Sequence, residues 1–323
     1  MEIKASVIVP AFNAEKTIAK CLEALSKQSF RGFEIIVVDD ESNDGTCRVV
    51  EKFSKARLVK QRHGGPAVAR NNGAKAAKGE IIVFTDSDCI AESNWLGEMV
   101  KPFENKGVAG VQGRYKCRQK EIVARLIQLE IEQSYERMQK MEFIDFIGSY
   151  SAAYRKNVFA QLKGFDTSFP IASGEDTDFS FRVHEKGHKM VFNPKAVVYH
   201  THPTSFKKYF KVKFFRAFWR TKVYKRHKGK IVGDAYTSQM LKAQIGLFFL
   251  AVLAFIAGAI GIAPLFYSGA LLVILLLSAL PFAFWAGRKD LAVGAISPFM
   301  VLARTIVFSA GLVFGTIRQV FGQ

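Results

Sequence analysis

Neither of the two common glycine-rich phosphate motifs occurs in this sequence. No G-x-G-x-x-G follows the first predicted strand, and no G-x-x-x-x-G-K-[ST] is present in the 323 residues. The first motif brings backbone close to a pyrophosphate in dinucleotide-binding domains, and the second cradles phosphates in P-loop proteins. Their absence excludes both classes as an account of any nucleotide chemistry.

Cysteine is scarce. The four cysteines lie far apart, at Cys21, Cys47, Cys89 and Cys117, without the spacing of a zinc site or a disulfide framework. Such usage is typical of the reducing cytosol. Residues 1–4 lead directly into an apolar run, without the basic and hydrophobic regions of a secretory signal, so we expect no cleaved signal peptide.

Charge is absent from a long C-terminal stretch. Residues 243–287 contain no Asp, Glu, Lys or Arg, whereas a bilayer-crossing helix needs only about 20 apolar residues. The stretch is long enough for two crossings, with Pro264 where a turn between them would fall. A further apolar segment, 291–317, is interrupted only by Arg304. We therefore predict a transmembrane region of about three helices.

Positive charge is abundant and concentrated just before this region. The net charge is +18, and residues 207–230 include eleven Lys or Arg and no Asp or Glu. Such a run is typical of nucleic-acid binding or of a belt at an anionic membrane surface. Its position favours the membrane over nucleic acid. Because cytoplasmic flanks carry excess Lys and Arg, the soluble part is expected in the cytoplasm, and Arg288-Lys289 marks a second cytoplasmic turn.

These contrasts predict three regions. Residues 1–206 form a cytoplasmic domain, 207–242 form basic juxtamembrane helices, and 243–323 form the transmembrane domain. The protein is accordingly expected to be an integral protein of the cell membrane.

The N-terminal region alternates apolar runs with helical patterns. Apolar runs typical of buried strands lie at 5–12, 34–40 and 81–84, and 57–61 predicts a further short strand. Helical spacing occurs between them, for example at 18–25 and in the alanine-rich 67–77. This alternation predicts an α/β fold with a doubly wound, mostly parallel sheet, in which ligands bind beyond the carboxyl ends of the strands.

Two carboxylates follow the most apolar of these runs. Asp86 and Asp88 come directly after Ile81–Thr85 and are two residues apart, so a bend can aim both at one point. Paired hard oxygens suit Mg²⁺ or Mn²⁺ held against a diphosphate. The alternative is a solvated turn, in which Asp and Ser are common.

Five motifs in order carry a family resemblance. They are VIVPAFN at 7–13, VVDDESNDGT at 37–46, GPAVARN at 65–71, TDSD at 85–88 and GEDTDFSFR at 174–182. Together they resemble the nucleotide-sugar domain of family 2 glycosyltransferases, which have the GT-A fold. The likeness covers residues 5–205.

The resemblance implies roles for particular residues. Asp86, Ser87 and Asp88 would form the motif for metal and diphosphate, and Asp176 would be the catalytic base. Pro10, Phe12, Asp40 and Arg70 are expected on the donor side, with Asp40 at the nucleotide base. Uracil and guanine both offer ring N–H groups to a carboxylate, so a UDP-linked or a GDP-linked sugar fits. Helix capping is the alternative for Asp39, which precedes Asp40.

The acceptor half begins near Val108. We expect acceptor-side residues at Gly148 and Ser149, where small side chains let backbone approach a substrate, and at Glu175 and Asp178 beside the base. A long helix predicted at 121–141 has an apolar stripe that fits core packing or a membrane-lying gate for a lipid acceptor.

Two residues have alternatives of their own. His200 follows a predicted strand and is either a third metal contact or a structural histidine. Arg304 interrupts an apolar segment and is either a snorkelling anchor or a guanidinium that holds the phosphate of a lipid-linked acceptor.

The expected function is that of a membrane-anchored, metal-dependent, inverting glycosyltransferase. It would use a nucleoside-diphosphate sugar and a lipid-linked or membrane-proximal acceptor. One alternative is a processive polysaccharide synthase, although Lys213–Ala217 matches only the arginine of that subgroup's Gln-x-x-Arg-Trp motif. The non-enzymatic alternatives are a basic membrane scaffold and a nucleic-acid-binding protein.

Overall fold

The chain folds into two units. The computed structural model describes residues 2–231, 233–235 and 237–321, so residues 232 and 236 of the predicted juxtamembrane region lie outside it. The first unit consists of Met1–Arg118 and Tyr135–Thr201, and the second of Gln119–Ser134 and His202–Gln323. The predicted boundary after residue 206 did not anticipate that 119–134 group with the C-terminal helices.

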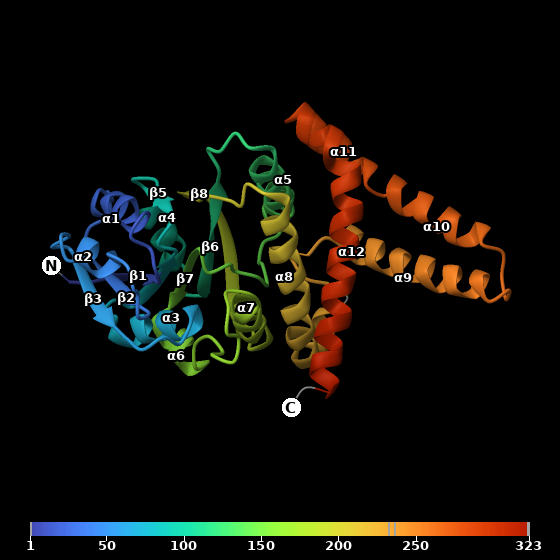
Figure 1. The fold of residues 1–323 in the computed structure, drawn as a ribbon. Coiled ribbons are helices and arrows are strands. Elements are labelled where there is room, and N and C mark those ends of the chain that lie inside the picture. Colours follow the sequence, from blue (N-terminus) through green and yellow to red (C-terminus); the bar gives the residue numbers. More distant parts are fainter. Residues whose placement is uncertain (1, 232, 236, 322–323) are drawn as a thin grey trace. The chain divides into compact units, whose positions relative to one another are not determined.

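The first unit is built on one eight-stranded sheet with the order β3-β2-β1-β4-β7-β6-β8-β5. Figure 1 shows its strands with helices on both sides. The strands are β1 (Ala5–Ala11), β2 (Phe33–Asp39), β3 (Ala56–Lys60), β4 (Ile81–Thr85), β5 (Ile90–Ala91), β6 (Val108–Lys116), β7 (Ser151–Arg155) and β8 (Lys189–Tyr199). Continuous apolar runs form β1, β2 and β4, which are buried on both faces.

The sheet is mixed but mostly parallel. The four neighbouring strands β3, β2, β1 and β4 pair in parallel, as does β6 with β8. β7 runs antiparallel to both of its neighbours, β4 and β6. Ser151, the first residue of β7, pairs with Thr85, the last residue of β4. The chain thus enters β7 at the carboxyl end of β4, which places the preceding turn beside Asp86–Asp88.

The helices of the first unit cover the two faces of this sheet. They are α1 (Ile18–Ser26), α2 (Thr46–Val50), α3 (Pro66–Ala76), α4 (Trp95–Val100), η1 (Lys101–Glu104), α6 (Lys156–Gln161) and α7 (Glu175–Glu185). The helix α5 (Ile122–Met138) belongs to the second unit through Ser134 and to the first in its last turn. Gly73 lets α3 approach the sheet, because a Cβ there would lie 2.3 Å from a methyl of Ile8.

An aromatic core anchors α7 to the sheet. Phe84 of β4 contacts Phe159 and Phe165 with ring centroids 5.4 and 5.3 Å apart, and Phe159 contacts Phe179 of α7 at 4.8 Å. Each such pair adds about 0.5–1.5 kcal/mol beyond the burial of its area. The strand that ends in Asp86 and the helix that begins at Glu175 are therefore held in one rigid core.

The second unit is helical. Besides most of α5 it contains α8 (Phe206–Arg226), η2 (Lys228–Lys230), α9 (Gln239–Ala259), α10 (Phe266–Leu277), α11 (Leu280–Gly287) and α12 (Leu291–Phe321). Three segments are long and apolar enough to cross a membrane: Gln239–Ala259, Phe266–Gly287 and Leu291–Phe321. This agrees with the predicted number. The second segment is divided between α10 and α11, and the third continues as one helix through Pro298.

The three apolar segments differ in what covers them. In the most apolar 18 residues of each segment, 11% are buried in α9 and 17% in α10–α11, against 39% in α12, among the described residues. The start of α12 packs with α5 in a cluster that includes Val123, Leu126, Val293 and Met300. The α9 and α10–α11 hairpin therefore presents most of its apolar surface outward, and α12 does so much less.

The later part of α12 packs closely along α8. A Cβ on Gly311 would lie 2.5 Å from the Phe214 carbonyl oxygen, and one on Gly315 would lie 2.5 Å from that of Phe218. Only glycine lets the two backbones approach this closely. The two helices run side by side in Figure 1.

Candidate active site

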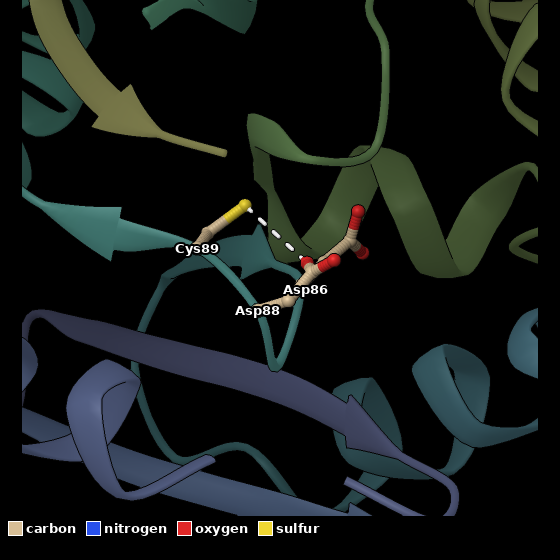
Figure 2. Close-up of side chains that lie close together, drawn as sticks. All are labelled: Asp86, Asp88 and Cys89. Carbon is tan, nitrogen blue, oxygen red and sulfur yellow. Dashed lines mark hydrogen bonds between the residues drawn. The ribbon is translucent and has the colours of Figure 1, made fainter. Parts of the chain in front are cut away.

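The turn after β4 gathers two carboxylates and a thiol. Thr85 ends β4 and Ile90 begins β5, and the backbone N–H of Cys89 donates to the Asp86 carbonyl at 3.0 Å to close the turn between them. One ligand atom each from Asp86, Asp88 and Cys89 lies within 4.8 Å of the others. Figure 2 shows the three side chains on this turn.

The oxygen donors of this cluster fit a hard divalent cation, and the thiol does not. The side chains of Asp86 and Asp88 are 29% and 36% exposed. Cys89 is buried, and burial followed by the charges of Asp86 and Asp88 raises the pKa of its thiol well above the usual value. A neutral thiol is a poor ligand, so the two carboxylates are the donors suited to Mg²⁺ or Mn²⁺.

His200 lies against the same turn. The antiparallel pairing of Ile90 with Tyr199 brings it there, and its Nε2 lies 3.2 Å from Asp88 Oδ2. Burial lowers the pKa of His200, but the hydrogen bond and charge of Asp88 outweigh it, so the pKa is raised overall. His200 thus forms an ion pair with Asp88, and its role as a third metal contact stays a prediction.

A stack of two tyrosine rings, held by a third tyrosine, lies against His200 and was not indicated by the sequence. The Tyr115 ring stacks on His200 at 4.7 Å and on Tyr150 at 3.5 Å between centroids. Tyr135 fixes the stack, since its hydroxyl accepts from the Tyr115 N–H at 2.9 Å and lies 2.7 Å from the Tyr150 hydroxyl. These residues come from separate elements, so no local motif connects them.

Arg70 is buried between the two acidic motifs. Its Nη2 donates to Asp86 Oδ1 at 2.8 Å and its Nη1 to Glu175 Oε1 at 3.0 Å. Burial opposes the charged form, but Asp86 and Glu175 raise the pKa of the guanidinium overall. Arg70, which we expected on the donor side, thus pairs with two carboxylates, one of which is Asp86 of the predicted metal and diphosphate motif.

The three carboxylates at the start of α7 have different environments. Glu175 is 1% exposed, and its burial, followed by the charge of Asp176, raises its pKa to about 7, with Arg70 opposing the rise. Asp178 is fully buried and accepts from Arg182 Nε at 2.9 Å. Asp176 is half-buried, and its Oδ1 accepts from the Thr177 N–H at 2.7 Å.

Asp40 holds the loop that leads into α3. Its Oδ1 accepts from Gln61 Nε2 at 2.6 Å and from the Gly64 N–H at 2.8 Å, and its Oδ2 accepts from the Gly65 N–H at 2.9 Å. Asp40 is only 3% exposed. Asp39 accepts from the Ser42 N–H at 3.2 Å, in the loop before α2, and so caps no helix through this bond.

The other residues expected in the first unit lie at the same edge of the sheet. Pro10 is half-buried near the end of β1, and Phe12 is 48% exposed with its ring 4.6 Å from that of His63. Ser87 is half-buried in the metal turn. Gly148 donates its N–H to the buried Gln112, which the sequence did not indicate, and Ser149 is buried.

Arg304, the remaining expected residue, belongs to the second unit. Its Nη1 donates to Glu130 Oε1 at 2.6 Å and its Nη2 to Gln244 Oε1 at 3.4 Å. Its side chain is 15% exposed. Arg304 thus faces α5 and α9 of the second unit, and its two predicted roles stay predictions.

Comparison with known proteins identifies the domain. The glycosyl transferase family 2 profile matches residues 6–163, which include the first four motifs and the turn of Asp86 and Asp88. The chain carries a family 2 glycosyltransferase domain. The match ends at residue 163, so it does not include the acidic start of α7.

Curated relatives of this family 2 domain carry glycosyltransferase names. Glycosyltransferase AglE of Haloferax volcanii is 27% identical over 58% of this chain and 63% of its own length. Glycosyltransferase GlyG of Streptococcus pneumoniae is 36% identical over 34% of this chain and 38% of its own. The matched part of the chain thus spans less than two thirds of either relative.

Solved structures share the fold. The mannosyltransferase PcManGT of Pyrobaculum calidifontis, solved with GDP-Man and Mn²⁺, superposes with a TM-score of 0.62 at 20% identity, covering 100% of this chain and 88% of that one. TarS 1–349 of S. aureus, solved with UDP, gives 0.51 at 21% identity, covering 98% and 92%. The family 2 domain therefore has the GT-A fold.

Proposed function

We propose that the protein transfers a sugar from a nucleoside-diphosphate sugar to a lipid-linked or membrane-proximal acceptor. The observation that carries the proposal is the meeting, within a family 2 domain, of the Asp86–Asp88 turn with the start of α7 through Arg70. A cation site and a base are the two groups that such a transfer requires.

The donor side is assigned to the turn and the end of β1. Asp86 and Asp88, with His200 beside them, would hold Mg²⁺ or Mn²⁺, whose charge offsets the charge that develops on the departing diphosphate. The exposed ring of Phe12 and the loop fixed by Asp40 lie where the nucleotide base is expected. PcManGT is solved with GDP-Man and TarS with UDP, so both nucleotides are candidates.

Asp176 is the carboxylate assigned as the base. Glu175 is engaged by Arg70 and Asp178 by Arg182, and both are buried, whereas Asp176 is partly exposed. Asp176 accepts the proton of the acceptor hydroxyl while that oxygen forms a bond to the anomeric carbon. The bond from that carbon to the diphosphate oxygen breaks, and the electron pair leaves with the nucleoside diphosphate. A single displacement of this kind inverts the anomeric configuration.

The membrane placement follows from the second unit. We assign α9 and the α10–α11 segment as the two crossings, and we place α12 at the membrane surface with α5 and α8. Gly311 and Gly315 join α12 to the basic α8, and most of the hairpin's apolar surface is uncovered. Both ends of a two-crossing hairpin lie on one side, the cytoplasmic side by the distribution of Lys and Arg.

An anionic bilayer is the surface that α8 fits. This helix exposes Lys207, Lys208 and Lys211 beside the apolar Phe206 and Val212, and each such cation near an anionic surface contributes about 1 kcal/mol. A relative 35% identical over 34% of this chain and 45% of its own length is named for a diphosphoundecaprenol acceptor. This supports a lipid-linked acceptor on the cytoplasmic side of the cell membrane.

The test is nucleoside diphosphate release by the detergent-purified protein from a panel of UDP- and GDP-sugars, with and without polyprenyl-linked acceptors. We expect one donor class to be turned over, acceptor-dependent transfer to be lost in Asp176→Asn, and donor binding to be kept within about threefold, because the amide retains the shape but takes no proton. No release from any donor would overturn the proposal. Normal transfer by Asp176→Asn with an inactive but folded Asp178→Asn would overturn the choice of base.

A further inference from the structure

The Arg70 guanidinium joins two parts of the site that lie far apart in sequence. Arg70 lies on α3 and its side chain is 3% exposed. It donates to Asp86 in the turn after β4 and to Glu175, the first residue of α7, 16 and 105 positions away. A guanidinium carries its donors in a rigid planar fork, so two such bonds fix the orientation of both partners.

The charge of Arg70 has carboxylate counterions without a substrate. Two carboxylates, Asp86 and Glu175, accept from opposite nitrogens of the fork. The pocket around the guanidinium is closed, since the Glu175 side chain is 2% exposed. A donor diphosphate would therefore meet Asp86 and the cation before it met Arg70.

The two carboxylate partners of Arg70 differ in the surroundings of the oxygen that does not bond to Arg70. Asp86 gives Oδ1 to Arg70, and with a side chain 29% exposed it still belongs to the cluster with Asp88. Glu175 is enclosed, and its Oε2 has no hydrogen-bond partner among the described residues. Arg70 thus donates both to Glu175 and to Asp86 of the cation turn. Glu175 itself does not belong to the cluster of Asp86 and Asp88.

We propose that Arg70 is a positioning residue that couples the cation turn to the helix carrying Asp176. It holds one oxygen of Asp86 inward so that the other faces the cation, and through Glu175 it sets the first turn of α7. Glu175 then affects cation binding without being a ligand. This inference rests on the roles proposed above for Asp86 and Asp176.

The first test measures Mn²⁺ binding without any donor, by electron paramagnetic resonance of the free ion. In Glu175→Gln, all of the Arg70 charge falls on Asp86, so we expect Mn²⁺ to bind at least about fivefold more weakly, within the range of couplings between residues in contact. In an Arg70→Lys background the same change should add less than about twofold, because lysine cannot bridge the two carboxylates. A simple loss of negative charge would instead weaken binding equally in both backgrounds, and that result would overturn the proposal.

A second variant separates geometry from charge. Glu175→Asp keeps the carboxylate but shortens the side chain by one methylene, so it no longer reaches Arg70. We expect Mn²⁺ binding to weaken as it does in Glu175→Gln. Wild-type affinity in a folded Glu175→Asp would overturn the proposal, and this test needs no variant of Arg70.

Turnover gives an independent readout. We expect Arg70→Lys to lower kcat at least about tenfold with the donor KM within about threefold, and the double variant with Glu175→Gln to be no slower than the slower single variant. Losses that multiply, or a raised KM alone, would indicate that Arg70 acts directly on the donor and would overturn the coupling. Arg57→Lys is the matched control, since Arg57 is an exposed arginine paired with Glu34.

Different results would overturn the proposed function and the proposed role of Arg70. Wild-type protein that turns over no donor at all would overturn the proposed function, while the Mn²⁺ titrations would still decide the role of Arg70. Active protein with additive Mn²⁺ effects would overturn the coupling alone.

Discussion

Substitution of Glu130 tests how the second unit is held together. Glu130 of α5 accepts from Arg304 of α12 at 2.6 Å, from Lys213 of α8 at 2.6 Å and from the Tyr209 hydroxyl at 2.9 Å. Its side chain is 9% exposed. One carboxylate thus joins three helices and is the counterion of two cations. Glu130→Gln keeps the shape and leaves both cations without their counterion.

The size of the effect follows from two estimates. Burial raises the pKa of Glu130, but Lys213 and Arg304 outweigh it and lower the pKa to about 2 from 4.5. A shift of this size corresponds to roughly 3 kcal/mol of folding free energy. Removing one partner of a buried ion pair costs about 3–5 kcal/mol. Burial and the neighbouring arginines lower the pKa of Lys213 to about 8, although Glu130 raises it. Without Glu130, Lys213 can lose its proton and so avoid an unpaired buried charge. We therefore expect a loss of unfolding free energy at the lower end of this range, about 3 kcal/mol.

The sign of the pH dependence follows from the lowered pKa. The stabilisation by Glu130 is present above pH 4.5, the value of the free group, and is lost as the pH falls toward 2. Glu130→Gln should therefore lie below wild type at neutral pH and approach it in acid.

The assay is equilibrium unfolding in mixed micelles, followed by tryptophan fluorescence. The matched control is Glu132→Gln on the same helix, whose 3.5 Å pair with Lys289 is more exposed, so we expect less than about 1 kcal/mol. The double variant Glu130→Leu with Arg304→Leu should be less stable than Arg304→Leu alone, because Arg304→Leu leaves Glu130 paired with Lys213, whereas the double variant leaves Lys213 without its counterion. A Glu130→Gln protein within about 0.5 kcal/mol of wild type would refute this account of the cluster, since the expected loss is several times larger.

Three further predictions concern the site and the membrane. Asp88→Ala should lower Mn²⁺-dependent donor turnover by at least about two orders of magnitude, and undiminished wild-type turnover in excess chelator would contradict the cation assignment. The pKa of Glu175 is raised to about 7, so its neutral form favours the fold, and the free energy of unfolding should fall as the pH rises from 4.5 to about 7. Glu175→Gln lacks this titration, so the difference in unfolding free energy between wild type and Glu175→Gln should change over that pH range. A difference that does not change with pH would refute the raised pKa. The third prediction uses Ile262→Cys, between α9 and α10, and Phe321→Cys, at the end of α12, in a background without Cys47 and Cys117. An impermeant maleimide added outside the cell should label Ile262→Cys and should not label Phe321→Cys. Labelling of both would mean that α12 crosses the bilayer.

Much of the fold is readable from local pattern. The apolar runs of β1, β2 and β4 have few alternatives to strands buried on both faces, and the uncharged 243–287 has few alternatives to a membrane hairpin. Motif order likewise indicated the family 2 domain before any coordinates. Each strand, motif or membrane helix is recognised within about 20 consecutive residues or fewer, without knowledge of its neighbours in space.

Pairing between distant segments required the tertiary structure. The antiparallel course of β7 depends on where the chain re-enters the sheet, and nothing in Ser151–Arg155 itself specifies that direction. The aromatic stack on His200 and the hydrogen bonds that enclose Asp40 are formed by residues on separate elements. Side-chain type predicts what a residue can bind, but its neighbours in space determine which partner it has.

Arg70 and Arg304 illustrate the same limit. From the sequence, Arg70 was expected on the donor side, and Arg304 was expected either as a snorkelling anchor or as a guanidinium that holds a lipid phosphate. The fold supplies buried carboxylates to both, Asp86 and Glu175 for Arg70 and Glu130 for Arg304, from positions 16 to 174 residues away. A buried cation requires a counterion wherever the chain can provide one, and only the folded chain determines which carboxylate that is.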